Sequence, residues 1–516
     1  MTDSERDDRI GRGEIQSRAA SGIAWTMIHA VATIPLAFVA NLIIARTLQS
    51  EGYGELAFLT TVMTIASAVV QFGVSDAVMQ YGAAAHARRD ARSVRFLLSA
   101  SQGFRFLVTI PVLVAAVVVI GRDAPGWLLV VAITFGVVIP NAVGGSGIAL
   151  SIENKTGPMA RIALLGNVAT QVFAVLAVLV AQSADAVWAT RLAAACIPFV
   201  LYLLPLSASY RWSVVRPVFP RGFPRGFWRF ALPAWGSALI GLLVTMRTEV
   251  VLLTWFSSAA DVGIYALAVG VSAYVFAPAG ALTGPLLPAL AALRAVDEVA
   301  MGRAFDRTIR VSSVISGGLA AFGLPVLGAL LPILYGTSFA SAVLPMLVLG
   351  VVGSVSAMAA PVVAFTLARL SSSLLLAINI TALVVNVGAA FALIPIAGVW
   401  GAVIANSLGV IVRLVLIVEG ERRALRMSLM HLGRLILPVV VATLAVASGW
   451  VLGIPFSAEP LIQAGVAGVA ALLVFLTLIW VLRAGLEQPD ANAVASIAPA
   501  RMRRVMVLAL KTITRR

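Results

Sequence analysis

Residues 227–268 read FWRFALPAWGSALIGLLVTMRTEVVLLTWFSSAADVGIYALA. From about 228 to 256 this stretch is almost wholly apolar, and a short gap containing Asp261 separates it from a second apolar run. A helix needs roughly 17–25 apolar residues to cross the hydrocarbon core of a bilayer, so each run is long enough to do so. The stretch therefore predicts two consecutive membrane-spanning helices joined by a short loop.

The same alternation of apolar runs and short polar gaps continues through the 516 residues. The chain is 60% hydrophobic and only 11% charged, which is too few charges to cover the surface of a soluble protein of this size. We predict an all-α polytopic membrane protein with about fourteen transmembrane helices. The expected spans are 20–45, 53–80, 96–120, 127–150, 160–182, 186–206, 228–256, 262–290, 308–334, 341–368, 372–394, 398–418, 432–453 and 460–483.

The basic residues follow a topological rule. All but six of the 37 Lys and Arg residues fall in every second gap or in the termini, whereas the other gaps carry acidic residues such as Glu51, Asp123 and Asp185. Loops rich in Lys and Arg remain in the cytoplasm, so we expect both termini on the cytoplasmic side. The protein itself is expected in the cell inner membrane. The net charge of +15 then reflects topology and contact with anionic headgroups, and no nucleic-acid partner is expected.

A short internal repeat predicts two similar halves. Gly52-Tyr53-Gly54-Glu55-Leu56-Ala57 follows the first apolar run, and Gly263-Ile264-Tyr265-Ala266-Leu267-Ala268 follows the seventh. Repeated halves are typical of secondary transporters. The expected parts are a cytoplasmic tail at 1–19, an N-lobe of six helices at 20–206, a cytoplasmic linker at 207–227, a C-lobe of six helices at 228–418, two additional helices at 419–483 and a basic cytoplasmic tail at 484–516.

Six basic residues do not follow the rule: Arg46, Arg105, Arg122, Arg191, Arg247 and Arg413. A charge at mid-membrane costs roughly 2.5–3.5 kcal/mol, so it usually faces a partner or an aqueous cavity. Arg122 and Arg413 lie near helix ends and are interpreted as snorkelling side chains. The other four predict a cationic cavity for an anion, such as a phosphate ester, because the arginine fork suits phosphate.

A second set of polar residues is expected to serve coupling or to line the cavity: Glu249, Asp76, Asn41 and His29. A structural salt bridge involving Arg247 and Glu249 remains an alternative, as does a polar interhelical bridge made by His29.

Other chemistries lack support in the sequence. It has no phosphate-binding loop, its three histidines lack the spacing of metal ligands, and its one cysteine, Cys196, lies in an apolar run. No catalytic residue, metal site or cofactor is expected, and the short outer gaps leave no room for an outer catalytic domain. The linker residues FPRGFPRGF and the basic segment 501–516 suit the membrane surface.

Several segments resemble the Wzx-type polysaccharide biosynthesis flippases of the multidrug/oligosaccharidyl-lipid/polysaccharide exporter superfamily. They are ARTLQSEGYGELAFLTTV at 45–62, QFGVSDAVMQYG at 71–82, the opening stretch 227–268, PLLPAL at 285–290 and LIPIAGVWGAVIANSLG at 393–409. The resemblance implies two six-helix lobes around a central cavity, with helices 1, 2, 7 and 8 lining it, plus two extra helices. Members of the family often have Asp where this chain has Glu249.

The resemblance also implies a function: moving a polyprenyl-diphosphate-linked oligosaccharide from the inner to the outer leaflet by alternating access. On this hypothesis Arg46 and Arg247, helped by Arg191 and Arg105, bind the diphosphate. The cycle would be coupled to protons, sodium ions or the membrane potential. Expected partners are the glycolipid, membrane lipids and polysaccharide assembly proteins.

Three alternatives stay open at this point. A lipid II flippase of the same superfamily is barely separated by sequence. A cation-coupled drug antiporter would favour acidic cavity residues and usually twelve spans. A membrane glycosyltransferase or polymerase would need acidic catalytic residues near a substantial outer loop, so we expect a transporter and not an enzyme.

Overall fold

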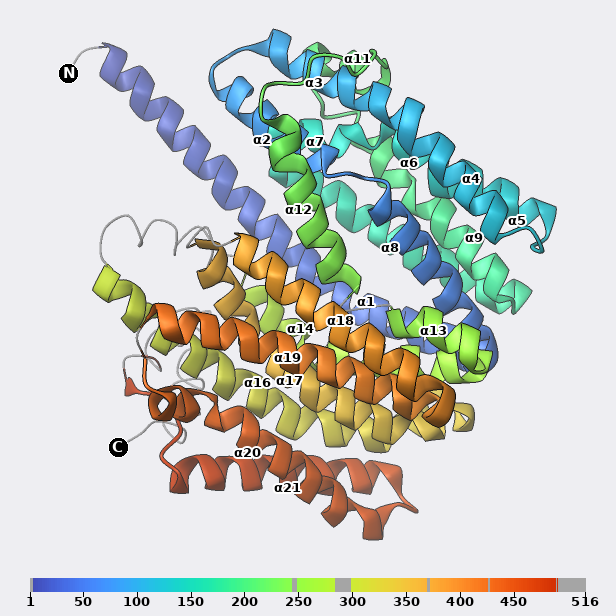
Figure 1. The fold of residues 1–516 in the computed structure, drawn as a ribbon, viewed down its shortest axis with the longest axis vertical. Coiled ribbons are helices and arrows are strands. Elements are labelled where there is room, and N and C mark those ends of the chain that lie inside the picture. Colours follow the sequence, from blue (N-terminus) through green and yellow to red (C-terminus); the bar gives the residue numbers. More distant parts are fainter. Residues whose placement is uncertain are drawn as a thin grey trace. The chain divides into compact units, whose positions relative to one another are not determined.

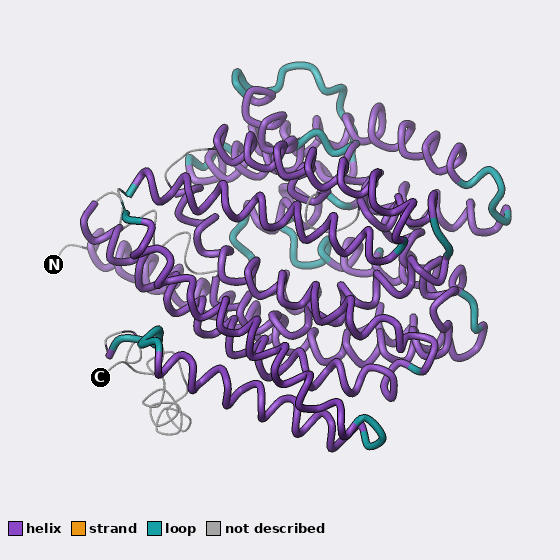
Figure 2. The backbone as a smooth tube through the Cα atoms, turned by 60° about the horizontal axis from the view of Figure 1, so that its bottom comes forward, coloured by secondary structure: helices purple, strands orange, loops and turns teal. Residues whose placement is uncertain are grey.

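The computed structural model describes residues 3–243, 248–283, 298–368, 372–425, 427–488 and 490. Within these ranges, the side chains of residues 3–31, 278–283, 298–301, 364, 366–368, 372 and 373 are not described. Every regular element in the described part is a helix, as the purple tube of Figure 2 shows. Twelve of these helices are long and apolar enough to cross a membrane. The predicted all-α polytopic fold is confirmed.

The expected count of fourteen spans is approximate, for two reasons. The first expected helix and most of the second lie in one helical stretch, α1 (Asp3–Val69), which turns at Gln49 and therefore qualifies once. The seventh, expected at 228–256, is represented by α12 (Phe227–Leu242) and α13 (Thr248–Phe256), each too short to qualify by itself. Residues 244–247 between them lie outside the described residues, as do the PLLPAL segment at 285–290 and the expected surface helix at 501–516.

The chain divides into two compact units, the first of which comprises Met1–Leu48 and Glu55–Leu239 (Figure 1). Besides most of α1 and α12, it contains α2 (Val74–Ala87), α3 (Ala91–Phe104), α4 (Ile110–Ile120), α5 (Gly126–Val131), α6 (Ile139–Val143), α7 (Gly145–Ile152), α8 (Thr156–Ala181), α9 (Ala184–Ala195), α10 (Ile197–Leu201) and α11 (Ala208–Val215). Two π-helical turns, η1 (Arg105–Thr109) and η2 (Ala132–Val138), join α3 to α4 and α5 to α6.

The second expected helix, 53–80, is interrupted between α1 and α2. Phe72 and Gly73 have positive φ angles of 47° and 66°, which end the helix. A Cβ on Gly73 would lie 2.2 Å from the carbonyl oxygen of Ala231 in α12, so only glycine allows the two backbones to approach this closely. The indole of Trp235 donates to the carbonyl of Ala68 (2.8 Å) near the C-terminal end of α1.

The expected linker 207–227 packs against the first unit. The Val218 amide donates to the carbonyl of Ser99 in α3 (3.0 Å). The Phe223 ring stacks on Phe227, with centroids 4.2 Å apart, and Phe227 is 1% exposed. These contacts make the linker an ordered part of this unit.

The second unit comprises Gln49–Gly54 and Ile240–Arg516. Its helices are α13, α14 (Ala259–Thr283), α16 (Glu298–Tyr335), α17 (Val343–Ala368), α18 (Ser372–Ala397), α19 (Val399–Ala424), α20 (Leu429–Gly453) and α21 (Pro460–Val481), with short 3-10 turns η4 (Thr337–Ala342) and η5 (Ile454–Phe456). Within it α18 packs along α19, and α20 packs along α21 and α16 (Figure 1).

The repeated glycine motif makes a close backbone contact in this second unit. A Cβ on Gly54 would lie 1.9 Å from the carbonyl oxygen of Ala259, and one on Gly263 would lie 1.9 Å from that of Ser50. Beside them the Tyr53 ring meets Phe339 edge-on at 5.9 Å. The six residues Gln49–Gly54 are therefore anchored to α14 and η4, although their neighbours in sequence belong to the first unit.

The last two helices, α20 and α21, form a tight pair through small residues. A Cβ on Gly449 would lie 2.4 Å from the carbonyl oxygen of Ala467, and one on Gly453 would lie 2.9 Å from the Ala467 Cβ. In a bilayer the hydrophobic effect does not hold helices together, because lipid is as apolar as their side chains. Small residues allow the backbones to pack closely instead.

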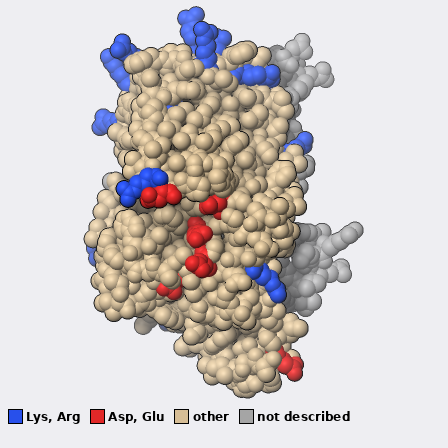
Figure 3. Space-filling model, turned by 90° about the vertical axis from the view of Figure 1, so that its right-hand side faces the viewer, with Lys and Arg blue, Asp and Glu red and all other residues tan. Residues whose placement is uncertain are grey.

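Large apolar side chains are exposed on the helix surfaces, for example Val180 (85%) and Ile396 (84%). Figure 3 shows a face on which charged side chains are few and uncharged residues dominate. Such a surface suits lipid as the solvent, so the chain is a multi-pass membrane protein.

Candidate functional site

Glu249 is the second residue of α13 and is fully buried, with 0% of its surface exposed. Asn386 of α18 donates its amide Nδ2 to Glu249 Oε1 at 2.6 Å, and Asn406 of α19 donates to the same oxygen at 3.2 Å. The buried Tyr265 of α14 also faces this carboxylate. Four helices of the second unit thus meet at one acidic group, and we call these four residues the Glu249 cluster.

Two oxygen atoms of the Glu249 cluster lack hydrogen-bond partners. Glu249 Oε2 and Asn386 Oδ1 are buried, and no donor among the described residues bonds to them. Buried acceptors are almost always satisfied, and an isolated buried carboxylate is strongly disfavoured. A proton on the carboxyl group, or a small cation bound by these oxygens, would relieve both costs.

The two asparagines were not identified from the sequence, which singled out Glu249 alone in this region. Asn386 and Asn406 lie within long apolar runs, and the run that contains Asn386 also contains Asn379. A polar residue in such a run is a weak signal because many of them bond only to their own helix. The relevant property is that both face Glu249, and this depends on how α18 and α19 pack.

Gly409 of α19 leaves room for the side chain of Asn386, because it has no side chain of its own. A Cβ on this glycine would lie 2.7 Å from the Asn386 Cβ and 3.1 Å from its Nδ2. The same Nδ2 also donates to the carbonyl of Ala405 at 3.2 Å. The amide is thus fixed between α19 and the carboxylate, which fits a preorganised polar site.

Arg105 is the buried cation of the first unit, and 8% of its surface is exposed. It opens the π turn η1, and its Nη2 donates to the Ser75 hydroxyl of α2 at 3.2 Å. A Cβ on Gly144, between α6 and α7, would lie 3.1 Å from its Nη1. The glycine-rich break in the fourth expected helix therefore leaves room for a guanidinium group.

Gln102 of α3 completes this part of the first unit. Its side-chain amide is hydrogen-bonded to the carbonyls of both Asn141 and Ala142 at 2.9 Å, at the C-terminal end of α6. A helix C-terminus carries a partial negative charge that favours a nearby cation such as Arg105. These surroundings explain why the interior of the first unit can accommodate the Arg105 charge. They also leave the guanidinium group able to bind an anion.

The other candidates are distributed as follows. Arg46 and Asn41 lie in α1 and Arg191 lies in α9, with Arg46 exposed and the other two partly buried. Asp76 in the first turn of α2 is exposed. Arg247 lies outside the described residues, and so does the His29 side chain. The described candidate arginines thus all belong to the first unit, whereas Glu249 belongs to the second.

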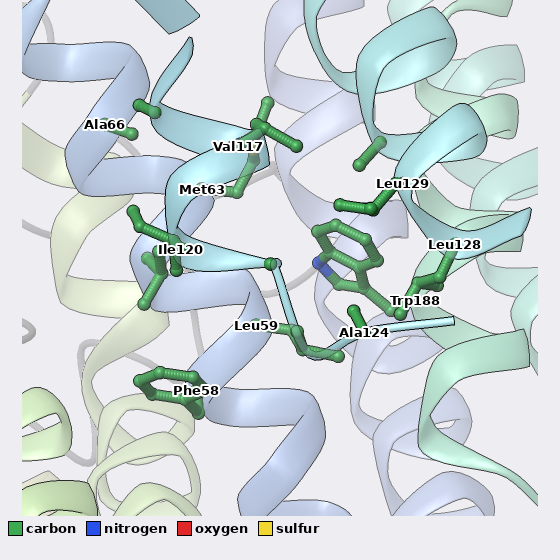
Figure 4. Close-up of a pocket in the computed structure, with 14 residues that line it drawn as sticks. Phe58, Leu59, Met63, Ala66, Val117, Ile120, Ala124, Leu128, Leu129 and Trp188 are labelled. Atoms are coloured by element: carbon green, nitrogen blue, oxygen red, sulfur yellow. The ribbon is translucent and has the colours of Figure 1, made fainter. Parts of the chain in front are cut away.

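The first unit also has a pocket with wholly apolar walls, shown in Figure 4. Its walls include Met63 of α1, Val117 of α4, Leu129 of α5 and Trp188 of α9. None of the candidate site residues lines this pocket. It therefore has the character of a hydrocarbon-filled packing space and lacks that of an anion site.

Comparison with solved structures defines the class of protein. The fold is similar to that of the lipid II flippase MurJ in an inward closed conformation, with a TM-score of 0.63, 10% identity, and 89% of this chain and 99% of that one covered. It is also similar to an inward-facing multidrug resistance MATE family transporter of the MOP superfamily, with a TM-score of 0.59, 15% identity, and coverage of 77% and 98%. The chain therefore has the fold shared by these two membrane proteins.

The family follows from the sequence model that matches residues 43–344, described as polysaccharide biosynthesis protein. The match covers more than half of the chain, so this chain belongs to the polysaccharide biosynthesis protein family. Comparison with curated proteins gives no match.

Proposed function

We propose that this protein is a flippase that moves a polyprenyl-diphosphate-linked oligosaccharide from the inner to the outer leaflet of the cytoplasmic membrane. The observation that carries the proposal is the family match over residues 43–344. Membership of a polysaccharide biosynthesis family supports a glycan as part of the cargo, and the fold shared with a lipid II flippase supports a lipid-linked cargo. The basic gaps give the orientation, with both termini in the cytoplasm.

Binding of the diphosphate is assigned to Arg46, Arg105, Arg191 and Arg247. Guanidinium groups form paired hydrogen bonds with phosphate oxygens and keep their charge in a poorly hydrated site. The glycan would occupy the hydrated interior, and the prenyl chain would remain in lipid. Asn41, Asp76 and His29 are proposed as further polar groups of the cavity.

Coupling is assigned to Glu249. Its carboxylate, two asparagine amides and the unpaired oxygens Glu249 Oε2 and Asn386 Oδ1 provide a site that a proton or a sodium ion can occupy. Occupancy changes the charge in the interior of the second unit, which gives the ion a means to favour one conformation over another. The membrane potential contributes about 2.3 kcal/mol per charge per 100 mV to any net charge movement.

The test is transport in proteoliposomes that contain undecaprenyl-diphosphate-linked oligosaccharide, read by a glycosidase that is added outside. Arg46→Gln and Arg247→Gln should each abolish the appearance of glycan in the outer leaflet. Arg122→Gln is the matched control, because Arg122 is 80% exposed and pairs only with its neighbour Asp123. Wild-type transport by both test variants would overturn the proposed site.

A lipid II flippase is the second candidate, favoured by the similarity to MurJ over 89% of this chain. The same vesicles loaded with lipid II distinguish the two. Transport of lipid II with no transport of longer lipid-linked oligosaccharides would assign the chain to peptidoglycan synthesis instead.

A further inference from the structure

Arg413 lies in α19, about 8 Å along the helix from residue 418, the expected end of this span, at 1.5 Å per residue. Its Nε donates to Asn379 Oδ1 of α18 at 2.9 Å, and Asn379 is 3% exposed. A snorkelling arginine extends along its helix toward the headgroups. This one bonds to a buried amide of the neighbouring helix, so snorkelling does not account for its position.

Arg413 and the Glu249 cluster share the same two helix faces. Asn379 and Asn386 are seven residues apart on α18, as are Asn406 and Arg413 on α19. Seven residues are nearly two helical turns, so each pair points to the same side of its helix and is separated by about 10 Å along it. Since α18 and α19 pack side by side, the Arg413–Asn379 pair lies one heptad from the two amides that hold Glu249.

Neither charge has an oppositely charged partner at close range among the described residues. Among the described residues, no carboxylate lies within ion-pair distance of Arg413, and no basic side chain lies within that distance of Glu249. The groups that face Glu249 are Tyr265, Asn386 and Asn406, all uncharged. At an effective dielectric constant of about 20, opposite charges separated by about 10 Å would change an equilibrium by about tenfold.

We propose that Arg413, positioned by Asn379, is the fixed countercharge of the Glu249 cluster and weakens its binding of the coupling cation. The inference rests on the proposed coupling role of Glu249 and deepens it. The guanidinium favours the ionised carboxylate and repels a proton or sodium ion. The site thereby releases its cation readily, which a cycling transporter needs.

The test is infrared spectroscopy of the purified full-length protein, using the band of protonated carboxyl groups that is lost in Glu249→Gln. The band is titrated with acid. Two variants remove the countercharge: Arg413→Gln deletes it, and Asn379→Asp neutralises it with an adjacent carboxylate. Each is compared with its own Glu249→Gln double variant, and Arg413→Lys is the charge-conserving control.

Both neutralising variants should titrate about one pH unit higher than the wild type, because the carboxyl group then holds its proton more tightly. Arg413→Lys should titrate like the wild type. Unchanged titration in Arg413→Gln and Asn379→Asp would overturn the proposal, including the case in which both only lower thermal stability. Normal glycolipid transport by Glu249→Gln would refute the coupling role separately, because the titration does not depend on transport.

Discussion

The carboxylate of Glu249 is held by amides, and its energetics differ from those of an ion pair. An amide hydrogen bond to a charged group contributes about 1.5–3 kcal/mol, whereas leaving the buried charged acceptor without a donor costs at least as much. Asn386 makes the shorter of the two amide bonds to Glu249. Its main contribution is therefore to make the buried carboxylate tolerable.

Asn386→Leu should lower the free energy of unfolding by about 2–3 kcal/mol, because it removes a donor from a buried acceptor. In a Glu249→Leu background the same change should cost much less, since no carboxylate remains to be satisfied. Thermal unfolding in detergent micelles measures both. Thr381→Val is the control, because this exposed hydroxyl of α18 bonds only to the carbonyl of Ala377. Equal losses in the two backgrounds would contradict the assigned role.

Asp90 caps the N-terminus of α3, where it accepts hydrogen bonds from the backbone amide and the hydroxyl of Ser93. These bonds hold the pKa of the Asp90 carboxyl below its usual value of 3.8. A lowered pKa in the folded state means that the contribution to stability is present above the unfolded value and is lost as the pH falls through the folded value.

Asp90→Asn keeps a good capping side chain and removes the charge. The variant should unfold at a slightly lower temperature than the wild type at neutral pH, and the difference should vanish in acid below the folded pKa. Thermal midpoints measured across that range give the result. A difference that persists unchanged at low pH would show that charge is not the source of the stabilisation.

At the scale of the helix, hydrophobic length predicted where the chain crosses the membrane but not where its helices break. The break between α1 and α2 depends on Gly73 approaching the backbone of Ala231, which is more than a hundred residues away. The π turn at Arg105 likewise depends on tertiary contacts with Ser75 and Gly144. Periodicity carries no information on such contacts.

The close contact of Gly54 with α14 gives a prediction for this element. Gly263→Ala should separate the two segments and destabilise the second unit by about 1–3 kcal/mol or more, since the new Cβ would lie 1.9 Å from the carbonyl oxygen of Ser50. Gly270→Ala on the same helix meets nothing within 4 Å and should be neutral or stabilising. Thermal unfolding of both variants tests this, and equal midpoints would show that the contact is not tight.

The linker gives a second prediction for an element. Phe223→Ala removes the ring that stacks on Phe227 and should release the segment, so that trypsin cleaves after Arg221 and Arg225 several-fold faster. Val218→Ala is the control, because Val218 is 42% exposed and lies in the same segment. Limited proteolysis of vesicles with this face outward measures the rates. Equal cleavage in the two variants would mean that the aromatic stack does not order the linker.

At the scale of the whole molecule, the sequence indicated which charged residues to consider, but it did not indicate how their side chains are arranged. The rule for basic loops isolated Arg105 as a charge inside a helix, and the structure places it in the buried interior of the first unit. Arg413 was also an exception to this rule and was interpreted as a snorkelling side chain, although its hydrogen bond to buried Asn379 directs it between two helices. Depth along a helix can be counted from sequence, but the direction of a side chain around the helix requires its neighbours.

The proposed cycle moves net charge, so its rate should depend on the membrane potential. An inside-negative potential of about 100 mV acting on one charge is worth about 2.3 kcal/mol, or roughly fiftyfold in an equilibrium constant. Glu249→Gln should change the slope of transport rate against potential, because the coupling cation then no longer contributes its charge. Arg122→Gln should keep the wild-type slope, since its side chain is exposed and paired with Asp123. Potentials set with potassium and valinomycin in proteoliposomes give these slopes. An identical slope for Glu249→Gln and the wild type would exclude Glu249 from the charge-moving step while leaving the arginine site intact.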